Sequence, residues 1–369
     1  MILSRRKLIQ ASGAGLLLSS ARRLSSQAPP ALYVAPMVKE FPGISQVTIA
    51  QGDDRRKNAC AALAALDDQI LPKLRRKKYV VIKTNNTSVV NQLASTHADA
   101  LRGIIDYLAP RFHGPIVIAE ASSGDTLQGF ESFHYTRLPD EYRDQKIRLV
   151  DLNREGKFES IPLIDSDMHV APVRLAARLL DPDAFVICSA IMKTHNSVVA
   201  TLSVKNMVLG AALHNPPGEQ RWSDKRKYHV GVRGNHYNML LTAQKLQPNW
   251  GATLIDGYEG MEGDGPVSGT PVPSRIAIAS TDYIAADRVA LEAMGIDPSW
   301  VGYLVYCEQV GLGNHDLKKI RVQGAALDSV RRKYRLHSDI DRELQWMGPM
   351  EDLPPKLGFR WNDGTESYG

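Results

Sequence analysis

Ionisable and hydroxyl side chains are crowded into residues 193–210, KTHNSVVATLSVKNMVLG, directly after a short apolar stretch that reads as a buried strand. A histidine such as His195 can move a proton, and a lysine at the rim of a buried segment can act as a base or as a covalent attachment point. Lys205 stands at such a rim, because residues 206–213 are mostly apolar. A capping histidine and a lysine that reaches solvent are the structural alternatives. The predicted catalytic residues here are Lys193, His195 and Lys205, and the predicted ligand-binding residues are Thr194 and Asn206.

Polar side chains also stand where other predicted strands end. Residues 79–83 (YVVIK) end in Lys83, and residues 115–120 (PIVIAE) end in Glu120. Ligands of parallel α/β sheets bind beyond the carboxyl ends of the strands, so we expect these groups to converge in one cleft with Lys193, His195 and Lys205. Strands also end in polar residues simply because they reach solvent. The further residues predicted at this edge are Glu120 as a catalytic group and Lys83, Asn85, Ser122 and Ser123 as ligand-binding groups.

An acidic, glycine-rich stretch, residues 256–266 (DGYEGMEGDGP), follows the predicted strand 253–256. Mg²⁺ and Ca²⁺ prefer oxygen ligands on flexible backbone, so a divalent cation is one interpretation, although the spacing is not that of an EF-hand. Acidic turns are also common on surfaces. The predicted metal ligands are Asp256, Glu259, Glu262 and Asp264.

The elements that must position these groups alternate between strands and helices. Continuously apolar strands alternating with amphipathic helices predict an α/β fold with a mostly parallel sheet and helices on both faces, in one or two lobes. A long loop insert, residues 214–234, is expected over the site, and residues 325–369 are expected to be an extension packed on the domain 29–324. The remaining predicted strands are 147–151, 184–190 and 275–280, and the predicted helices are 55–71, 96–108, 235–246 and 282–294.

The first 28 residues are typical of a targeting peptide, with a basic start, a short apolar run and small residues before Ala28. Residues 4–9 (SRRKLI) resemble the twin-arginine export signal. The apolar run is too short to span a bilayer, so no stable membrane span is expected after cleavage. We therefore predict the twin-arginine translocase as a partner, a periplasmic location, and a metal or cofactor, if there is one, that is loaded before export.

The charge balance argues against nucleic acid as a partner. The formal net charge is +5, but the first 28 residues carry five basic side chains and no acidic one. The rest of the chain has 40 basic and 40 acidic residues, so it lacks the positive excess typical of nucleic-acid binders. The three cysteines, Cys60, Cys188 and Cys307, are too far apart to form a Cys-x-x-Cys cluster.

Across residues 83–324, the chain resembles the family called domain of unknown function 362. The residues that carry this resemblance are, in order, Lys83-Thr84-Asn85, Thr96-His97, Ala119-Glu120, Lys193-Thr194-His195, Thr201-Leu202-Ser203-x-Lys205-Asn206, Asp256-Gly257, Met261-Glu262-Gly263-x-Gly265-Pro266 and Thr281-Asp282 to Asp287. The resemblance adds His97 to the predicted ligand-binding residues. Many members are linked to iron–sulfur modules, but this chain lacks the cysteines, so no iron–sulfur cluster is expected.

A more distant resemblance connects the chain to the nickel-dependent lactate racemase family. That family also has a histidine followed ten positions later by a lysine, the spacing of His195 and Lys205, and its lysine carries a nickel pincer nucleotide. Ser203 and Val204 stand where that family has glycines, and Glu120 to Gly124 occupy the place of its other catalytic histidine. This comparison implies a shared fold more than a shared reaction.

Together these patterns predict an exported enzyme that acts on a small anionic substrate in a cleft at the carboxyl edge of the sheet. Lys193 and Lys205 are expected to hold the anion while His195 moves a proton. The alternative is a periplasmic binding or accessory protein in which the same groups bind a small anion without turnover.

Overall fold

A large mixed sheet with strand order β12–β1–β11–β9–β7–β2–β3–β4 forms the centre of the fold. The structure is a computed structural model, and it describes residues 40–219 and 221–348. Two short strands extend the sheet, since β8 pairs with β7 and β10 pairs with β9. The strands of the sheet are β1 (Ser45–Gln51), β2 (Tyr79–Lys83), β3 (Ile116–Glu120), β4 (Ile147–Asp151), β7 (Ala184–His195), β8 (Val199–Thr201), β9 (Trp250–Glu262), β10 (Thr270–Val272), β11 (Ile276–Ser280) and β12 (Ile320–Gly324).

Five neighbouring strands, β9, β7, β2, β3 and β4, run parallel to one another. They include the predicted strands at whose ends the candidate site residues lie. The α/β fold class is confirmed. The predicted strand at 275–280 is β11, which runs antiparallel to both β9 and β1. It departs from the parallel pattern because β9 and β10 form an antiparallel pair that turns the chain back before β11.

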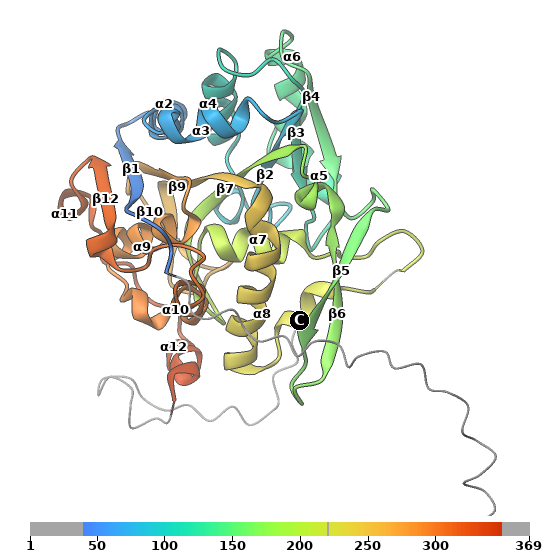
Figure 1. Cartoon of the computed structure of the whole chain (residues 1–369), viewed down its shortest axis with the longest axis vertical. Coiled ribbons are helices and arrows are strands. Elements are labelled where there is room, and N and C mark those ends of the chain that lie inside the picture. The colour runs from blue at the N-terminus through green and yellow to red at the C-terminus, as the bar shows by residue number, and fades with distance from the viewer. Residues whose placement is uncertain (1–39, 220, 349–369) are drawn as a thin grey trace, which may run out of the picture. The chain divides into compact units, whose positions relative to one another are not determined.

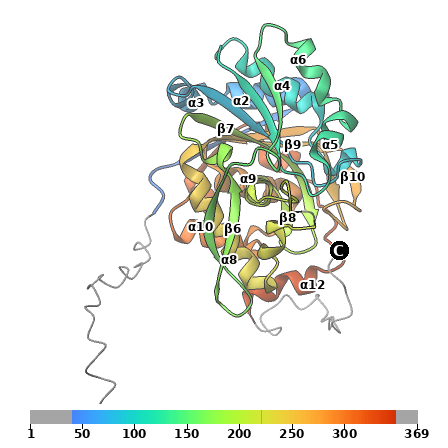
Figure 2. The same ribbon diagram turned by 90° about the vertical axis from the view of Figure 1, so that its right-hand side faces the viewer.

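Helices cover both faces of this sheet (Figures 1 and 2). The predicted helix 55–71 is two helices, α2 and α3, since Leu66 leaves the helical conformation with φ −114° and ψ 19°. The predicted helix 282–294 is confirmed as α9, with the side chain of Asp282 capping its first turn. The main helices are α2 (Arg55–Ala64), α3 (Asp67–Leu74), α4 (Ala98–Leu108), α5 (Thr126–Ser132), α6 (Leu138–Glu141), α7 (Ser203–Ala211), α8 (Gly231–Leu246), α9 (Tyr283–Met294) and α10 (Gly302–Gln309).

Alternate residues of each strand supply the two halves of the core, as the two-residue period of a strand requires. Val80 and Ile82 of β2 pack in the cluster that contains α2, α3 and α4. Val81 of β2 packs in the cluster that contains α7, α8 and α9. Because both faces are covered, a central strand such as β3 is buried at every position, which is why it has the sequence of a continuous apolar run.

Two strands continue well beyond the sheet edge at which the neighbouring strands end. β7 extends to His195, so the residues predicted to follow the strand 184–190 are part of it. β9 extends to Glu262, so the acidic stretch is mostly strand and not a loop. The pairing of β7 with β9 jumps from Ile191 opposite Asp256 to Lys193 opposite Met261. The glycines of this irregular stretch allow close packing, since a Cβ on Gly260 would lie 2.7 Å from the Met192 carbonyl oxygen.

A separate antiparallel hairpin, β5 (Phe158–Ile164) and β6 (Val170–Ala176), has no counterpart among the predicted elements. β1 and β12, which pair with each other in parallel, were not predicted either. The described part of the carboxy-terminal extension packs against α9, where the amides of Arg332 and Tyr334 donate to the carbonyls of Ala293 and Met294. It includes the short helices α11 (Leu327–Val330) and α12 (Ile340–Glu343).

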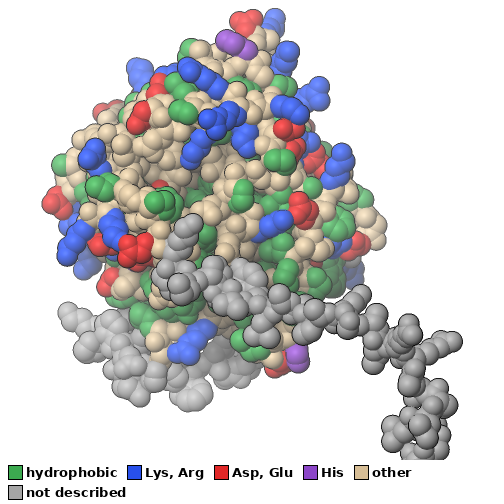
Figure 3. Space-filling view, in the orientation of Figure 1, with side chains coloured by type: hydrophobic (Ala, Val, Ile, Leu, Met, Phe, Trp, Pro, Cys, Tyr) green, Lys and Arg blue, Asp and Glu red, His purple; other side chains and the backbone are tan. Residues whose placement is uncertain are grey.

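The predicted targeting peptide lies outside the described residues. Among the residues that the structure describes, no helix is both long enough and apolar enough to cross a bilayer. Figure 3 shows basic and acidic side chains interspersed over one face of the molecule, in keeping with the balanced charge of the chain after residue 28.

Candidate functional site

The ends of β2 and β3 hold a buried ion pair. The Lys83 Nζ atom lies 2.7 Å from Glu120 Oε1, and both side chains are at most 3% exposed. Parallel pairing of β2 and β3 brings them together, because Lys83 lies opposite Ala119, the neighbour of Glu120. The Glu120 carboxylate also accepts hydrogen bonds from the backbone amides of Asn86 and Ala121, at 2.9 and 2.8 Å, and from the Thr84 hydroxyl at 3.2 Å. The two predicted site residues therefore neutralise each other.

Helix α7 closes over this ion pair. Asn206 Oδ1 accepts from Lys83 Nζ at 3.1 Å and from Asn85 Nδ2 at 2.9 Å, so one amide ties α7 to the end of β2. Gly210, one helical turn further on, is necessary for this approach, because a Cβ there would lie 2.1 Å from Lys83 Nζ. Lys83 is consequently a buried support of the site and does not line the cavity described below.

Lys205 is fixed at the first turn of α7. The N-terminus of this helix is capped from α9, where Asp287 accepts hydrogen bonds from the backbone amides of Ser203 and Val204 at 2.8 and 3.0 Å. The short β7–β8 hairpin precedes the helix and brings residue 205 back toward His195. The cap and the hairpin therefore set where the Lys205 side chain begins.

The Lys205 amine has no hydrogen bond and no ion pair to any residue that the structure describes. The side chain is 7% exposed, and burial lowers the pKa of Lys205 to about 7. The cause is desolvation, and not the charge of a neighbouring cation. At neutral pH a substantial fraction of this amine is therefore unprotonated and free to react.

His195 presents one nitrogen to the protein and leaves the other free. The backbone N–H of Ser197 donates to His195 Nδ1 at 3.1 Å, so Nδ1 is an acceptor and the neutral ring carries its proton on Nε2. Burial, followed by the charge of Lys205, holds the pKa of His195 well below its ordinary value. Within the described chain, Nε2 has no hydrogen-bond partner. It is therefore a neutral N–H donor available to a ligand.

His195 and Lys205 line a common cavity of about 700 Å³. Other walls come from the ends of β2 and β3, from α7 and from part of the stretch predicted to be a loop over the site, residues 214–234. The lining residues of that stretch are His214, Ser223, Lys225, Arg226 and His229. Glu120 is the one carboxylate among the described residues that line it, and it is already paired with Lys83. The ionisable side chains that line the cavity are Glu120, His195, Lys205, His214, Lys225, Arg226, His229 and Arg342.

Lys225 lies where α7 ends. Its Nζ atom donates to the carbonyl oxygens of Leu209 and of Ala212, the latter at 2.8 Å. These carbonyls are among those that a helix leaves unpaired at its C-terminus, so the lysine caps α7 from the overlying segment. Burial lowers the pKa of Lys225 to about 7 as well. With Arg226 and Arg342, it gives the cavity a basic lining.

Six of the predicted site residues line this cavity, and several others do not. Lys193 is a correction to the prediction, because its ammonium donates to Thr87 Oγ1 at 2.9 Å and to the carbonyls of Ala94 and Pro266 at 2.8 and 3.3 Å. These bonds use all three of its donors, so Lys193 ties loops together and is not placed to hold an anion. The predicted residues that do line the cavity are Asn85, Glu120, Ser123, His195, Lys205 and Asn206.

Three further predicted ligand-binding residues, His97, Thr194 and Ser122, do not line the cavity. His97 caps α4, accepting on Nδ1 from the amide of Asp99 at 3.0 Å. The Thr194 hydroxyl donates to the carbonyl of Gly263 at 2.7 Å, which ties β7 to the chain beyond β9. The Ser122 side chain is buried beside the cavity without lining it.

The four acidic residues that were predicted to bind a metal do not have a common partner. Asp256 pairs with Arg55 at 3.2 Å, and Glu259 is exposed. Glu262 accepts from the backbone amide of Arg335 at 2.8 Å, and Asp264 accepts from that of Ser338 at 3.0 Å. The two last contacts anchor the carboxy-terminal extension. The four carboxylates therefore do not share one centre in this structure.

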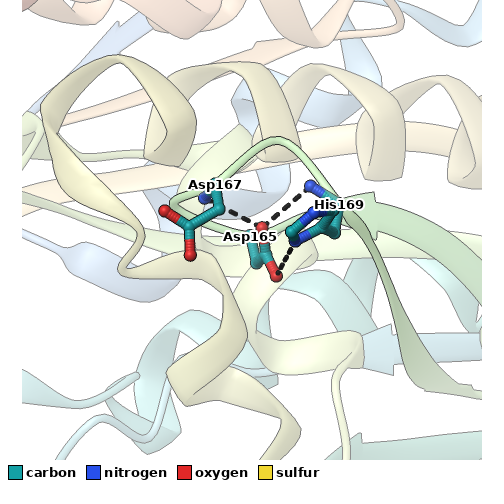
Figure 4. Close-up of side chains that lie close together, drawn as sticks. All are labelled: Asp165, Asp167 and His169. Carbon is teal, nitrogen blue, oxygen red and sulfur yellow. Dashed lines mark hydrogen bonds and ion pairs between the residues drawn. The ribbon is translucent and has the colours of Figure 1, made fainter.

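In the described ranges, the acidic and histidine side chains that do gather in a group of three are Asp165, Asp167 and His169 (Figure 4). They form the turn between β5 and β6. Asp165 Oδ1 accepts from the backbone amides of both Asp167 and His169 at 2.9 Å. This is the hydrogen bonding of an Asx-type turn, which accounts for the cluster without an ion.

Sequence reasoning did not single out the contributions of residues 214–229 and of the extension to the cavity. The first segment is expected from the sequence only as a loop over the site, and the second only as an extension packed on the domain. The high content of basic residues and histidine in residues 214–229 was the available signal. Gly210 had no signal, because its role depends on its close approach to Lys83, which is distant in sequence.

Comparisons with known proteins identify the family of the chain. A family model described as Domain of unknown function (DUF362) matches residues 80–292, which include β2, β3, β7, α7 and α9. The thylakoid-associated protein sll1697 of Synechocystis is 30% identical over 152 residues, which are 40% of this chain and 43% of that protein. The chain thus spans less than half the length of that relative.

One solved structure is also similar. It is a structural-genomics crystal structure of a protein from Thermotoga maritima, with 11% sequence identity and a TM-score of 0.41. The similarity covers 70% of this chain and 60% of that one.

Proposed function

The chain belongs to the family called domain of unknown function 362, and we propose that it is an enzyme that acts on a small anionic substrate with the neutral amine of Lys205. The proposal rests on one observation. Lys205 is a buried amine without a partner in the described chain, and it lines a cavity whose other ionisable side chains are almost all basic. A basic, partly desolvated cavity favours anions, and a lysine with a pKa near 7 is matched to proton transfer at neutral pH.

His195 has a different role in this proposal from the one that the sequence suggested. Its pKa lies well below the ordinary value, so the neutral imidazole is a weak base. The free Nε2–H is instead suited to donate a hydrogen bond to a substrate oxygen and to stabilise negative charge that develops there. Lys205 therefore takes the role of proton acceptor, and His195 that of electrophile.

Arg226 and Arg342 are the groups that would bind the anionic part of the substrate, since a guanidinium stays charged at any physiological pH. Lys225 lines the same cavity, but its donors are engaged with the end of α7. Glu120 is engaged with Lys83 and would not repel the anion as a free carboxylate would.

The proposed location remains the periplasm, reached through the twin-arginine translocase.

Proton transfer to or from carbon can be tested without knowing the complete reaction. Lactate, pyruvate and dihydroxyacetone phosphate would be incubated with the full chain in D₂O, and deuterium at carbon followed by mass spectrometry. We expect exchange with at least one of the three compounds, and its loss in Lys205→Met with the anion still bound. A matched control is Lys57→Met, because Lys57 is an exposed lysine remote from the cavity lining.

The alternative function, a binding or accessory protein, predicts a different result. Anions would bind with the same dependence on Arg226 and Arg342, but neither wild type nor any variant would exchange carbon-bound hydrogen. If the anions neither bound nor exchanged, both functions would be refuted.

A further inference from the structure

Four lysines in the described part of the chain are at most 9% exposed, and three of them have two or three acceptors. Lys83 contacts Glu120, Asn206 and its own neighbour's carbonyl, at 2.7, 3.1 and 2.5 Å. Lys193 has three acceptors, and Lys225 has two carbonyls. Lys205 alone among these four has no acceptor in the described part of the chain. Of these four buried amines, Lys205 is thus the one to which the described chain offers no hydrogen-bond acceptor.

A neutral amine can take a proton or can form a bond to carbon. We propose that Lys205 forms an imine with the carbonyl carbon of its substrate, which makes anionic aldehydes and ketones, such as oxo acids or phosphorylated carbonyl compounds, the substrate class of the cavity. This inference rests on the proposed function, because it uses the same amine and the same basic lining.

Groups suited to each stage of imine formation line the cavity with Lys205. The free Nε2–H of His195 can donate to the carbonyl oxygen and increase the positive charge on the carbon. The Thr201 hydroxyl, which is 3% exposed, lines the cavity and has no hydrogen-bond partner in the described chain. A buried hydroxyl without a partner is costly, so this one is suited to bind and relay a proton at the substrate. A volume of about 700 Å³ leaves room for the substrate and for the water that is released.

The chemical step balances without an oxidant or a metal. The lone pair of Lys205 Nζ attacks the carbonyl carbon, and the electron pair of the C=O bond moves to the oxygen. A proton passes from nitrogen to that oxygen, which gives a carbinolamine. Protonation of the hydroxyl then releases water and leaves a protonated imine. One amine, one carbonyl and one proton thus yield one iminium ion and one water.

The anionic group of the substrate would be held by Arg226 and Arg342 while the carbonyl meets Lys205. This division explains why a cavity with one reactive amine is lined by additional cations. A cationic iminium beside those groups is stabilised by the bound anion, so the reaction favours substrates that carry their own negative charge.

The test is reductive trapping. The full chain at pH 7 would be mixed with glyoxylate or, separately, with neutral acetaldehyde, and treated with sodium cyanoborohydride. Peptide mapping by mass spectrometry would then locate and count the reduced adducts. Lys57 serves as an internal reference, since its side chain is 84% exposed.

We expect glyoxylate to label Lys205 at least about tenfold faster than Lys57. A lysine with a pKa of about 7 is about half neutral at pH 7, whereas a free lysine with a pKa near 10.4 is neutral in about one molecule in 2,500. The lower nucleophilicity of the weaker base offsets only part of that difference. We also expect the preference for Lys205 over Lys57 to be smaller with acetaldehyde, because the cations of the cavity do not attract a neutral carbonyl compound.

Two variants complete the test. Lys205→Arg should lose the fast adduct, and Lys57→Arg should keep it. Glyoxylate that labels Lys205 no faster than Lys57 in folded wild type would overturn the inference, whatever the variants do. Deuterium exchange in wild type without any adduct on Lys205 would leave the proposed function intact and refute the imine, so the two failures are distinguishable.

Discussion

The buried ion pair between Lys83 and Glu120 should make a large contribution to stability that depends on both partners. Glu120→Gln keeps the size of the side chain but leaves the fully buried Lys83 ammonium without a counter-charge. Breaking a buried pair in this way costs about 3–5 kcal/mol. Unfolding of roughly 300 residues has an entropy of about 0.65 kcal/mol/K, so the expected fall in Tm is about 5–8 °C. Urea unfolding followed by circular dichroism would measure the change in free energy.

The chain contains a matched control for this experiment. Lys78 and Asp183 have the same N–O distance, 2.7 Å, but their side chains are 76% and 47% exposed. Asp183→Asn should therefore cost less than about 1 kcal/mol. The double variant Lys83→Met/Glu120→Gln should be more stable than the sum of the two single changes predicts, because neither charge is then left alone. A cost below about 1 kcal/mol for Glu120→Gln would refute the reasoning that burial makes this pair strong.

Four further predictions follow from the charges of the site and of the amino terminus. The pKa of Lys205 is about 7 in the folded chain and about 10.4 in the unfolded chain, so the unfolded state binds more protons between these values and the free energy of unfolding rises with pH there. Lys205→Met should therefore raise the melting temperature, and more at pH 6 than at pH 9. Binding of oxalate at pH 7 should be accompanied by uptake of up to about half a proton at Lys205, because a bound anion raises the pKa of that lysine. Calorimetry in buffers of different ionisation enthalpy would measure this proton uptake. The uptake should be unchanged in Lys57→Met. A chelator should leave the melting temperature unchanged, because the carboxylates of residues 256–264 are exposed or bonded to protein groups; a clear fall would restore the metal interpretation. Replacing Arg5 and Arg6 together by lysine should leave the precursor in the cytoplasm, and normal export of that variant would exclude the twin-arginine route.

The parallel half of the sheet could be predicted because its strands are buried on both faces. An apolar run such as residues 116–120 has no other simple explanation when it lies between two helical patterns. β12 and the β5–β6 hairpin could not be found in this way, because their residues are partly exposed. β1 is mostly buried, but polar residues interrupt its apolar ones (SQVTIAQ), so it does not form an apolar run. Likewise, nothing local in residues 275–280 shows that the strand runs antiparallel, because direction is set by the chain reversal at β10.

Within the site, the sequence predicted which residues converge better than it predicted what they do. Parallel neighbours end at one edge, and this topological rule brings Glu120, His195 and Lys205 into one cavity. The partner of each charged group comes from another part of the chain. Lys193 has acceptors 73 to 106 residues away in sequence, and no local pattern distinguishes it from Lys205.

That difference between two lysines of one short stretch shows how the fold selects a reactive group. Both amines are buried, and desolvation is the largest cause that lowers the pKa of each to about 7; for Lys193 the charge of Lys205 lowers it further, whereas that of Glu120 raises it. For Lys193, three oxygen acceptors surround the ammonium and favour its charged form, so this lysine serves as a rigid cross-link between loops. For Lys205, the same desolvation acts without any acceptor in the described chain, so the neutral form is the one that suits its surroundings. The reactivity of Lys205 therefore follows from the lack of a hydrogen-bond acceptor for its amine in the described chain, which leaves the neutral amine available to a substrate that Arg226 and Arg342 hold in the cavity.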